Sequence, residues 1–161
     1  MYAVNSGGEA NNSGSFLEEV VEREAKARGF HIADYSYVGD HHDLLNPNVL
    51  IRNVPFRSAY GCASRSEFVI RCRIGQRDIR IECKWQQKDG SVDEKFPYML
   101  LNAEKYQPES EIVLLIDGGG ARPEAVAWLK KAAKRVSTKK IHVFTVTEYR
   151  QWFQKLCNGN A

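Results

Sequence analysis

Two short stretches on either side of Gly75 and Gln76 constrain the fold more than any other part of the chain. Residues 67–74 read EFVIRCRI and residues 77–86 read RDIRIECKWQ, and in both stretches apolar and polar side chains alternate. Alternation with a period of two is typical of a β-strand that buries one face. Glycine at the first of two intervening positions suits a type II′ turn. The sequence therefore predicts an antiparallel hairpin.

The predicted turn also determines which residues lie opposite each other. A two-residue turn pairs Ile74 with Arg77 and fixes the register of both strands. In this register six apolar side chains come to one face of the sheet, namely Phe68, Ile70, Cys72, Ile79, Ile81 and Cys83. Because the turn was assigned without reference to these residues, their agreement supports the hairpin.

The opposite face of the hairpin carries charged side chains. Glu67 is predicted to lie opposite Lys84, while Glu82, Lys84 and Gln86 share this face because they are two residues apart. Glu67 and Glu82 then become diagonal neighbours, about 7–8 Å apart. Two carboxylates can bind a hard divalent cation, and a neighbouring lysine can orient water, assist its deprotonation or stabilise charge on a phosphate. A Glu-x-Lys on a strand is more often a solvated, salt-bridged surface, but charges beneath covering helices need a purpose.

The remaining segments indicate an α/β protein. Before the hairpin, the expected elements are a helix over 15–28 capped by Ser13 or Ser15, a short strand or turn at 30–37, and a strand at 49–60 with Pro55 at an edge or bulge. After the hairpin, three helices are expected: one over 91–106 with a Ser91–Glu94 capping box, one over 123–134, and one over 147–156 capped by Thr147. Strands at 112–116 and 141–146 lie between these helices. This predicts a mixed central sheet flanked by helices, in the order α-β-β-β-α-β-α-β-α. Residues 1–13 are expected to form a flexible tail, and residues 14–157 a single domain.

Composition excludes several classes of protein. Of the 161 residues, 43% are apolar and 27% are charged, so the chain is neither disordered nor fibrous, and its net charge of +3 excludes histone-like binding. No apolar run approaches the roughly 20 residues that span a bilayer, so we expect no membrane association. The four cysteines lack CxxC spacing, which indicates reduced, buried thiols in a cytoplasmic protein.

Three motifs taken together resemble the PD-(D/E)xK nuclease superfamily. They are GSFLE at residues 14–18, SEFVI at residues 66–70 and IECKWQ at residues 81–86. The stretch over residues 84–98 is similar to small phage or restriction-type members. The resemblance covers about residues 14–156 and implies a restriction-endonuclease-like core. It also implies a Mg²⁺-dependent DNA endonuclease, with Mn²⁺ as a substitute and no small organic cofactor.

The same resemblance implies a metal site. Glu67, Glu82 and the backbone carbonyl of Cys83 would bind the ion, and Glu18 on the first helix would complete or tune the site. Glu22 lies one helical turn from Glu18 on the same face and is the alternative. This sequence has Glu67 where the first acid of the family is usually aspartate.

The resemblance further implies that Lys84 is the catalytic lysine and that Gln86 positions water or contacts the phosphate. Basic residues on bordering segments are predicted to contact the nucleic-acid backbone, namely Arg52, Arg57, Arg65, Lys88 and Lys95. Since one domain supplies one site, cleavage of both DNA strands favours a homodimer.

Other functions stay open at this point. Within the enzyme class, a junction resolvase fits the same residues. A catalytically silent nucleic-acid-binding module would keep the fold without the chemistry. A nucleotide-binding regulator would use the loop Gly118–Gly120, although this loop lacks the lysine and the spacing of a P-loop.

Overall fold

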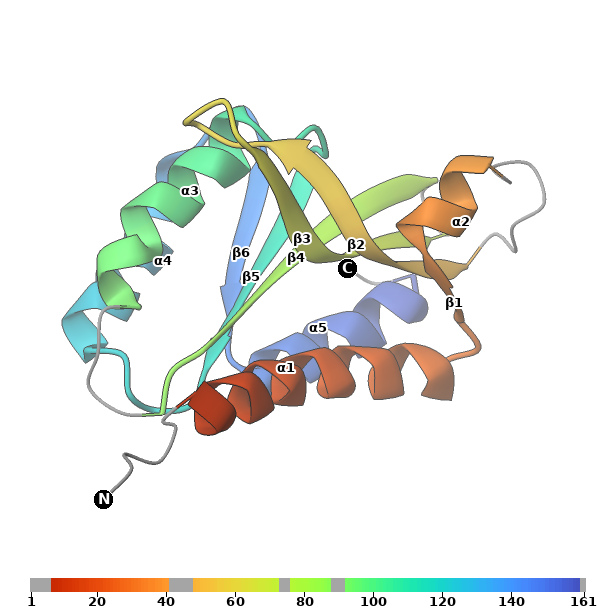
Figure 1. Cartoon of the computed structure of the whole chain (residues 1–161), viewed down its shortest axis with the longest axis horizontal. Helices are drawn as coiled ribbons and strands as arrows, with labels where there is room; N and C mark the ends of the chain where they lie inside the picture. Colours follow the sequence, from red (N-terminus) through yellow and green to blue (C-terminus); the bar gives the residue numbers. More distant parts are fainter. Residues whose placement is uncertain (1–6, 41–47, 73–75, 88–91, 160–161) are drawn as a thin grey trace, which may run out of the picture.

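A six-stranded sheet forms the centre of the fold (Figure 1). The computed structural model describes residues 7–40, 48–72, 76–87 and 92–159, and within them the strands lie in the order β1-β2-β3-β4-β5-β6. They are β1 (His31–Asp34), β2 (Val49–Arg57), β3 (Ala63–Cys72), β4 (Arg77–Trp85), β5 (Glu111–Asp117) and β6 (Lys140–Phe144). The pairs β2–β3 and β3–β4 are antiparallel and the other three pairs are parallel. The sheet is therefore mixed, as the sequence predicted.

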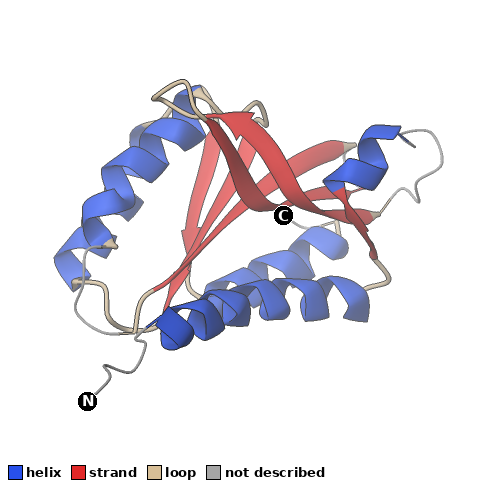
Figure 2. Ribbon diagram, viewed as in Figure 1, coloured by secondary structure: helices blue, strands red, loops and turns tan. Residues whose placement is uncertain are grey.

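Helices cover both faces of this sheet (Figure 2). They are α1 (Gly7–Ala27), α2 (Tyr35–Asp40), α3 (Phe96–Lys105), α4 (Pro123–Arg135) and α5 (Val146–Cys157), and a 3₁₀ turn, η2 (Asp93–Lys95), precedes α3. Helices α1 and α5 bury residues such as Leu17 and Phe153 against one face of the sheet. On the other face, α3 and α4 bury Phe96 and Leu129 against β5 and β6. The sheet thus has a separate apolar core on each side.

The predicted hairpin is confirmed, but its register differs by two residues. Phe68 pairs with Ile81 and Cys72 pairs with Arg77, so four residues connect the strands where two were expected. Residues 73–75 lie outside the described residues, and the predicted turn at Gly75 falls among them. Because side chains alternate with a period of two, a shift of two keeps each one on its predicted face. All six apolar hairpin residues accordingly belong to the core beneath α1 and α5.

The first helix is longer than the sequence predicted. α1 begins at Gly7, so the helix extends into the segment where a tail was predicted. Ser13 and Ser15 consequently lie inside the helix and cannot cap it. β1 lies within the segment predicted as a short strand or turn, whereas α2 was not expected.

The last helix has its cap two residues earlier than predicted. The Thr145 side chain accepts a hydrogen bond from the backbone of Glu148, and the Glu148 carboxylate accepts one from the backbone of Thr145, which forms a reciprocal capping box. Thr145 has extended backbone angles, whereas Thr147 already lies inside the helix. The other predicted box falls on Ser91, which lies outside the described residues.

β2 changes direction at Asn53, beside the strand that carries Glu67. Asn53 has φ of 56°, a conformation that asparagine tolerates better than most residues, and its side chain donates to Asp34 at 2.9 Å. It lies between the pairs Arg52–Phe68 and Val54–Ser66. Beyond it, Pro55 pairs with β3 alone within the described residues, because β1 covers β2 only as far as Arg52. The edge predicted from Pro55 is present.

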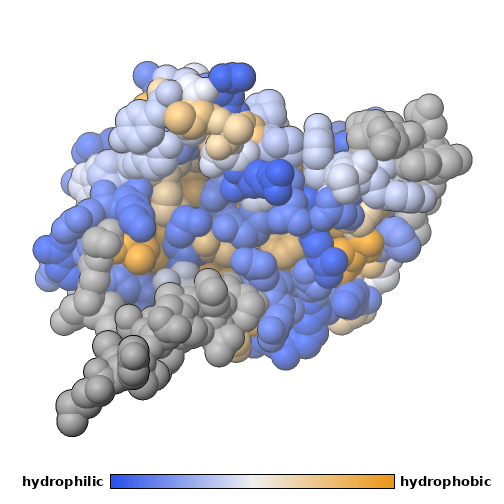
Figure 3. All heavy atoms as spheres, viewed as in Figure 1, coloured by the Kyte–Doolittle hydropathy of each residue, from blue (hydrophilic) through white to orange (hydrophobic). Residues whose placement is uncertain are grey.

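No helix among residues 7–40, 48–72, 76–87 and 92–159 is long and apolar enough to cross a bilayer. The face drawn in Figure 3 is largely hydrophilic, with apolar colour confined to patches. The four cysteines are free thiols; Cys72 and Cys83 are buried, as predicted, but Cys62 is exposed and Cys157 is half-buried.

Candidate active site

The predicted site lies where β3 and β4 separate. The described ladder between these strands ends at Phe68 and Ile81, whereas β4 continues to pair with β5 as far as Trp85. The backbone N–H of Cys83 would bond to β3 if the ladder continued. Here it donates to the Glu67 carboxylate at 2.9 Å. A carboxylate therefore takes the place of a strand partner, and this fixes Glu67 between the two strands.

Lys84 joins the two predicted acids electrostatically. Its Nζ lies 3.5 Å from Glu67 Oε1 and 3.8 Å from Glu82 Oε2. The prediction that Glu67 lies directly opposite Lys84 is wrong, because the shifted register would place Glu67 nearest to Glu82. Lys84 also donates to the Cys83 carbonyl at 3.0 Å, the atom predicted to bind metal. Burial lowers the pKa of Lys84, but the carboxylates of Glu67 and Glu82 outweigh it, and the net result is a raised pKa.

Glu82 is held through one of its two oxygens. Its Oε1 accepts from Ser66 Oγ at 2.6 Å and from Gln107 Nε2 at 2.7 Å. Oε2 is the oxygen that lies closer to Lys84. The side chain is 10% exposed, and burial together with the charge of Glu67 raises the pKa of Glu82 to about 7, although Lys84 opposes the shift.

A fully buried arginine stands behind this carboxylate. Arg80 is 1% exposed and donates to Ser66 Oγ at 2.8 Å and to the carbonyl of Val54 at 3.1 Å. Its other donors form a two-point ion pair with Glu109, at 2.5 and 2.8 Å. A buried charge is tolerated only when it is paired and hydrogen-bonded, and Arg80 meets both conditions. Through Ser66 it connects the interior of the fold to Glu82.

The two candidate acids of α1, Glu18 and Glu22, have different surroundings in the structure. Burial raises the pKa of Glu18, and the nearby charges of Glu67 and Glu22 raise it further. Glu18 therefore lies close enough to interact with the site. Glu22 is engaged elsewhere, since both its oxygens accept from Arg52 at 2.7 Å. Arg52, a predicted phosphate contact, is consequently paired with an acid of α1.

Gln86 belongs to a turn beside the acids. Its side-chain amide donates to the carbonyl of Gly120 at 3.1 Å, and its own backbone carbonyl accepts from the N–H of Gly120 at 2.8 Å. A Cβ at Gly118 would lie 2.2 Å from the Gln86 carbonyl oxygen. These contacts give Gly118 a structural reason, namely close packing of the turn on the end of β4, in place of the phosphate loop considered above.

The other predicted nucleic-acid contacts are spread over the surface. Arg57 is exposed and donates to the carbonyl of Gly61 at 2.6 Å. Arg65 on β3 and Lys95 before α3 are exposed as well. Lys88 lies outside the described residues.

The donor set fits a hard divalent cation. Glu67, Glu82 and Glu18 supply carboxylate oxygens, which Mg²⁺ and Mn²⁺ prefer. Burial, and after it the charge of Glu67, raises the pKa of Glu18 and of Glu82, and a cation would offset that repulsion from Glu67. Among the described residues, however, no three His, Cys, Asp or Glu side chains are already gathered closely enough to hold a metal. Some side-chain movement would therefore accompany binding.

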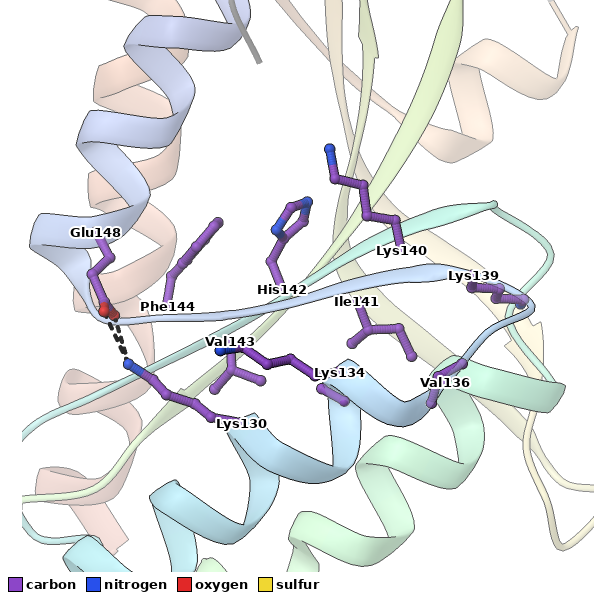
Figure 4. A pocket seen from close by; sticks show the side chains of 11 residues that line it. Lys130, Lys134, Val136, Lys139, Lys140, Ile141, His142, Val143, Phe144 and Glu148 are labelled. Carbon is purple, nitrogen blue, oxygen red and sulfur yellow. Dashed lines mark hydrogen bonds and ion pairs between the residues drawn. The ribbon is translucent and has the colours of Figure 1, made fainter.

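A cavity of about 460 Å³ lies elsewhere, along the edge strand β6 between α4 and α5 (Figure 4). Glu18, Glu67 and Glu82 do not line it. Its lining includes Lys130, which forms an ion pair with Glu148 at 2.9 Å, and Lys134 and Lys140. Lysines beside an edge strand are a common protection against unwanted strand pairing.

Comparison with known protein families identifies the family of this chain. Residues 9–157 match the PD-(D/E)XK nuclease superfamily domain, which is nearly the whole chain. The chain belongs to this superfamily, and its helix-flanked sheet is the restriction-endonuclease-like core that the resemblance implied. A search of curated proteins gives no match.

Sequence reasoning missed three residues that hold Glu82, namely Ser66, Arg80 and Gln107. Arg80 carried a signal, because it shares its strand face with Glu82 and a charge beneath a helix requires a partner. Ser66 precedes Glu67 but has no charge that would draw notice. Gln107 is 25 residues from Glu82 in the sequence, so only the packing of α3 on the sheet reveals it.

Proposed function

We propose that the protein is a metal-dependent nuclease that hydrolyses phosphodiester bonds of DNA at Glu67, Glu82 and Lys84, with Glu18 from α1. The observation that carries the proposal is the position of Lys84, within 3.8 Å of both acids at the point where β3 and β4 separate. Membership of a nuclease superfamily supports the reaction class.

The residues of the proposed site would have different roles in the reaction. Glu67, Glu82 and Glu18 would hold Mg²⁺, or Mn²⁺ in its place, and the Cys83 carbonyl would join them. The bound cation would supply Lewis-acid stabilisation and a more acidic water. Because its raised pKa keeps Lys84 protonated at neutral pH, we assign Lys84 the stabilisation of negative charge on the phosphate. A water-positioning role for Gln86 stays a prediction.

Plasmid cleavage in Mg²⁺, Mn²⁺ or EDTA tests the proposal. We expect cleavage with either metal and none in EDTA, and we expect Glu82→Gln and Lys84→Ala to reduce the rate by at least about a hundredfold, as for loss of a proton-transfer or charge-stabilising group. Glu82→Gln keeps the size of the buried side chain. Lys130→Ala on α4 removes an ion-paired lysine far from these acids and serves as the matched control.

The results separate the alternatives. Cleavage that persists in EDTA, or in both site variants, would refute the site. Absence of cleavage on duplex, single-stranded, RNA and four-way-junction substrates, together with tight binding, would indicate a silent binding module. Preferential cleavage of the junction would indicate a resolvase.

A further inference from the structure

Residues 49–66, in the hairpin formed by β2 and β3, carry a net positive charge. Residues 49–66 contain three arginines and no acidic residue. Arg52 is paired with Glu22 of α1. Arg57 and Arg65, nearer the tip of the hairpin, are exposed, and no acid is among their described contacts. A surface of this kind attracts an anionic partner.

The tip of the hairpin is held in one conformation. The N–H of Ser58 donates to the Cys62 carbonyl at 2.9 Å, and the N–H of Gly61 donates to the Ser58 carbonyl at 2.8 Å. The N–H of Ala59 donates to Asn102 of α3 at 2.9 Å, which fastens the tip to that helix. Figure 1 shows this loop lying against α3. Side chains that are exposed on the tip are therefore already in position for a partner.

The tip displays a large aromatic side chain. Tyr60 is 78% exposed, the highest value among the exposed large hydrophobic residues of the described chain. Its ring stacks on Tyr98 of α3, with centroids 4.8 Å apart and an interplanar angle of 17°. Arg57 donates to the carbonyl of Gly61, so a guanidinium lies at the same tip. A fixed, exposed ring next to a cation matches the elements that bind single-stranded nucleic acid.

We propose that Tyr60, supported by Tyr98, stacks on an unpaired base of the nucleic acid, while Arg57 and Arg65 contact its phosphates. Every base has a π-face, but a duplex covers the faces of its internal bases, so this contact selects single-stranded, flared or terminal nucleotides. The inference rests on the proposed function for its substrate and narrows it to nucleic acid with unpaired bases. β3 connects the tip to the site, since Ala63 at its start and Glu67 are four residues or about 13 Å apart.

Fluorescence anisotropy with labelled oligonucleotides in EDTA measures this contact without cleavage. We expect single-stranded and forked oligonucleotides to bind more tightly than a blunt duplex of the same length. Tyr60→Ala should weaken binding to the unpaired probes by roughly 5- to 100-fold, as for loss of one stacked base, and Tyr60→Phe should retain it. Tyr106→Ala removes an exposed tyrosine from the end of α3 and is the matched control. The fluorescence of 2-aminopurine in the bound oligonucleotide should be quenched by wild type, Tyr60→Phe and Tyr106→Ala, but not by Tyr60→Ala.

The outcomes distinguish this inference from the proposed function. Equal binding by wild type and Tyr60→Ala would overturn the stacking contact, as would full retention in Tyr60→Leu, which is apolar but cannot stack. If Tyr60→Ala cleaves and binds like wild type, the nuclease assignment stands and the inference fails. If Tyr60-dependent binding is present and no metal supports cleavage, the inference stands and the nuclease assignment fails. Absence of nucleic-acid binding in any form would overturn the inference and leave the tip as a site for an acidic protein segment.

Discussion

At the scale of single residues, the two oxygens of Glu82 have different partners. Oε1 accepts from Ser66 and Gln107, and Oε2 lies toward Lys84. Neutral donors on one oxygen orient the carboxylate without neutralising it. We therefore expect a cation to approach through Oε2.

The Gln107 side chain provides a test of this orientation. Gln107→Ala should weaken Mn²⁺ binding by roughly tenfold or more, since a hydrogen bond to a charged group contributes about 1.5–3 kcal/mol. Isothermal titration calorimetry measures the affinity directly. Gln154→Ala, an exposed glutamine on α5, should bind Mn²⁺ like wild type. Equal affinity in all three proteins would show that Gln107 does not orient Glu82.

The raised pKa of Glu82 predicts how stability depends on pH. Between its ordinary value of 4.5 and about 7, the folded chain keeps a proton that the unfolded chain has lost. The free energy of unfolding should therefore fall as pH rises through this window. The loss is at most about 3.5 kcal/mol, at roughly 1.4 kcal/mol per pKa unit.

Urea denaturation of wild type and Glu82→Gln from pH 4 to pH 8 measures this loss. Glutamine cannot ionise, so the variant should show a flatter profile and should exceed wild type above pH 7. Glu124→Gln, which changes an acid in the first turn of α4, controls for loss of charge. Parallel profiles for wild type and Glu82→Gln would contradict the assignment.

At the scale of elements, the turn after β5 depends on one glycine. Gly118 has φ of 110°, and a Cβ there would meet the backbone of Gln86 at 2.2 Å. Gly119 also has positive φ, at 76°, but no atom lies within 4 Å of its Cβ position. Gly118→Ala should cost more than about 3 kcal/mol, against about 1 kcal/mol for Gly119→Ala, because only the first combines backbone strain with a clash. Thermal unfolding of the two variants compares them, and equal losses would contradict the close packing.

The hairpin strands also show how much of the fold could be predicted from the sequence. Alternation along residues 67–72 and 77–85 was enough to identify two strands and their buried face, because a face depends only on whether a position is odd or even. Register depends on the length of the connection, and nothing in the local sequence distinguishes a two-residue from a four-residue link when Gly75 lies within it. The face was therefore predicted correctly and the pairing was not.

For the candidate site, the charged residues were recognisable and their neutral supports were not. Glu82 and Lys84 lie two residues apart, so strand geometry alone places them together. Gln107 and Ser66 reach Glu82 from other elements. The choice between Glu18 and Glu22 likewise required the structure, because both lie on one helix face and only the contact with Arg52 separates them.

At the scale of the whole molecule, the question is how one site would cut two strands. We expect two copies to act together. Size-exclusion chromatography with light scattering should then give a mass about twice the chain's 18.3 kDa, and linear plasmid should appear without accumulation of nicked circles. A monomer that produces nicked circles first would show that each chain acts alone.

The hydrogen bond from the Cys83 amide to Glu67 has a practical consequence for spectroscopy. This amide is protected by a side chain that is itself a proposed metal ligand, and neighbouring β4 amides are protected by the ladder. Its ¹⁵N–¹H resonance and its rate of hydrogen–deuterium exchange should therefore respond to any displacement of Glu67, while the amide of Ile81 stays constant. The protein thus contains its own reporter of site rearrangement, which requires no substrate or turnover.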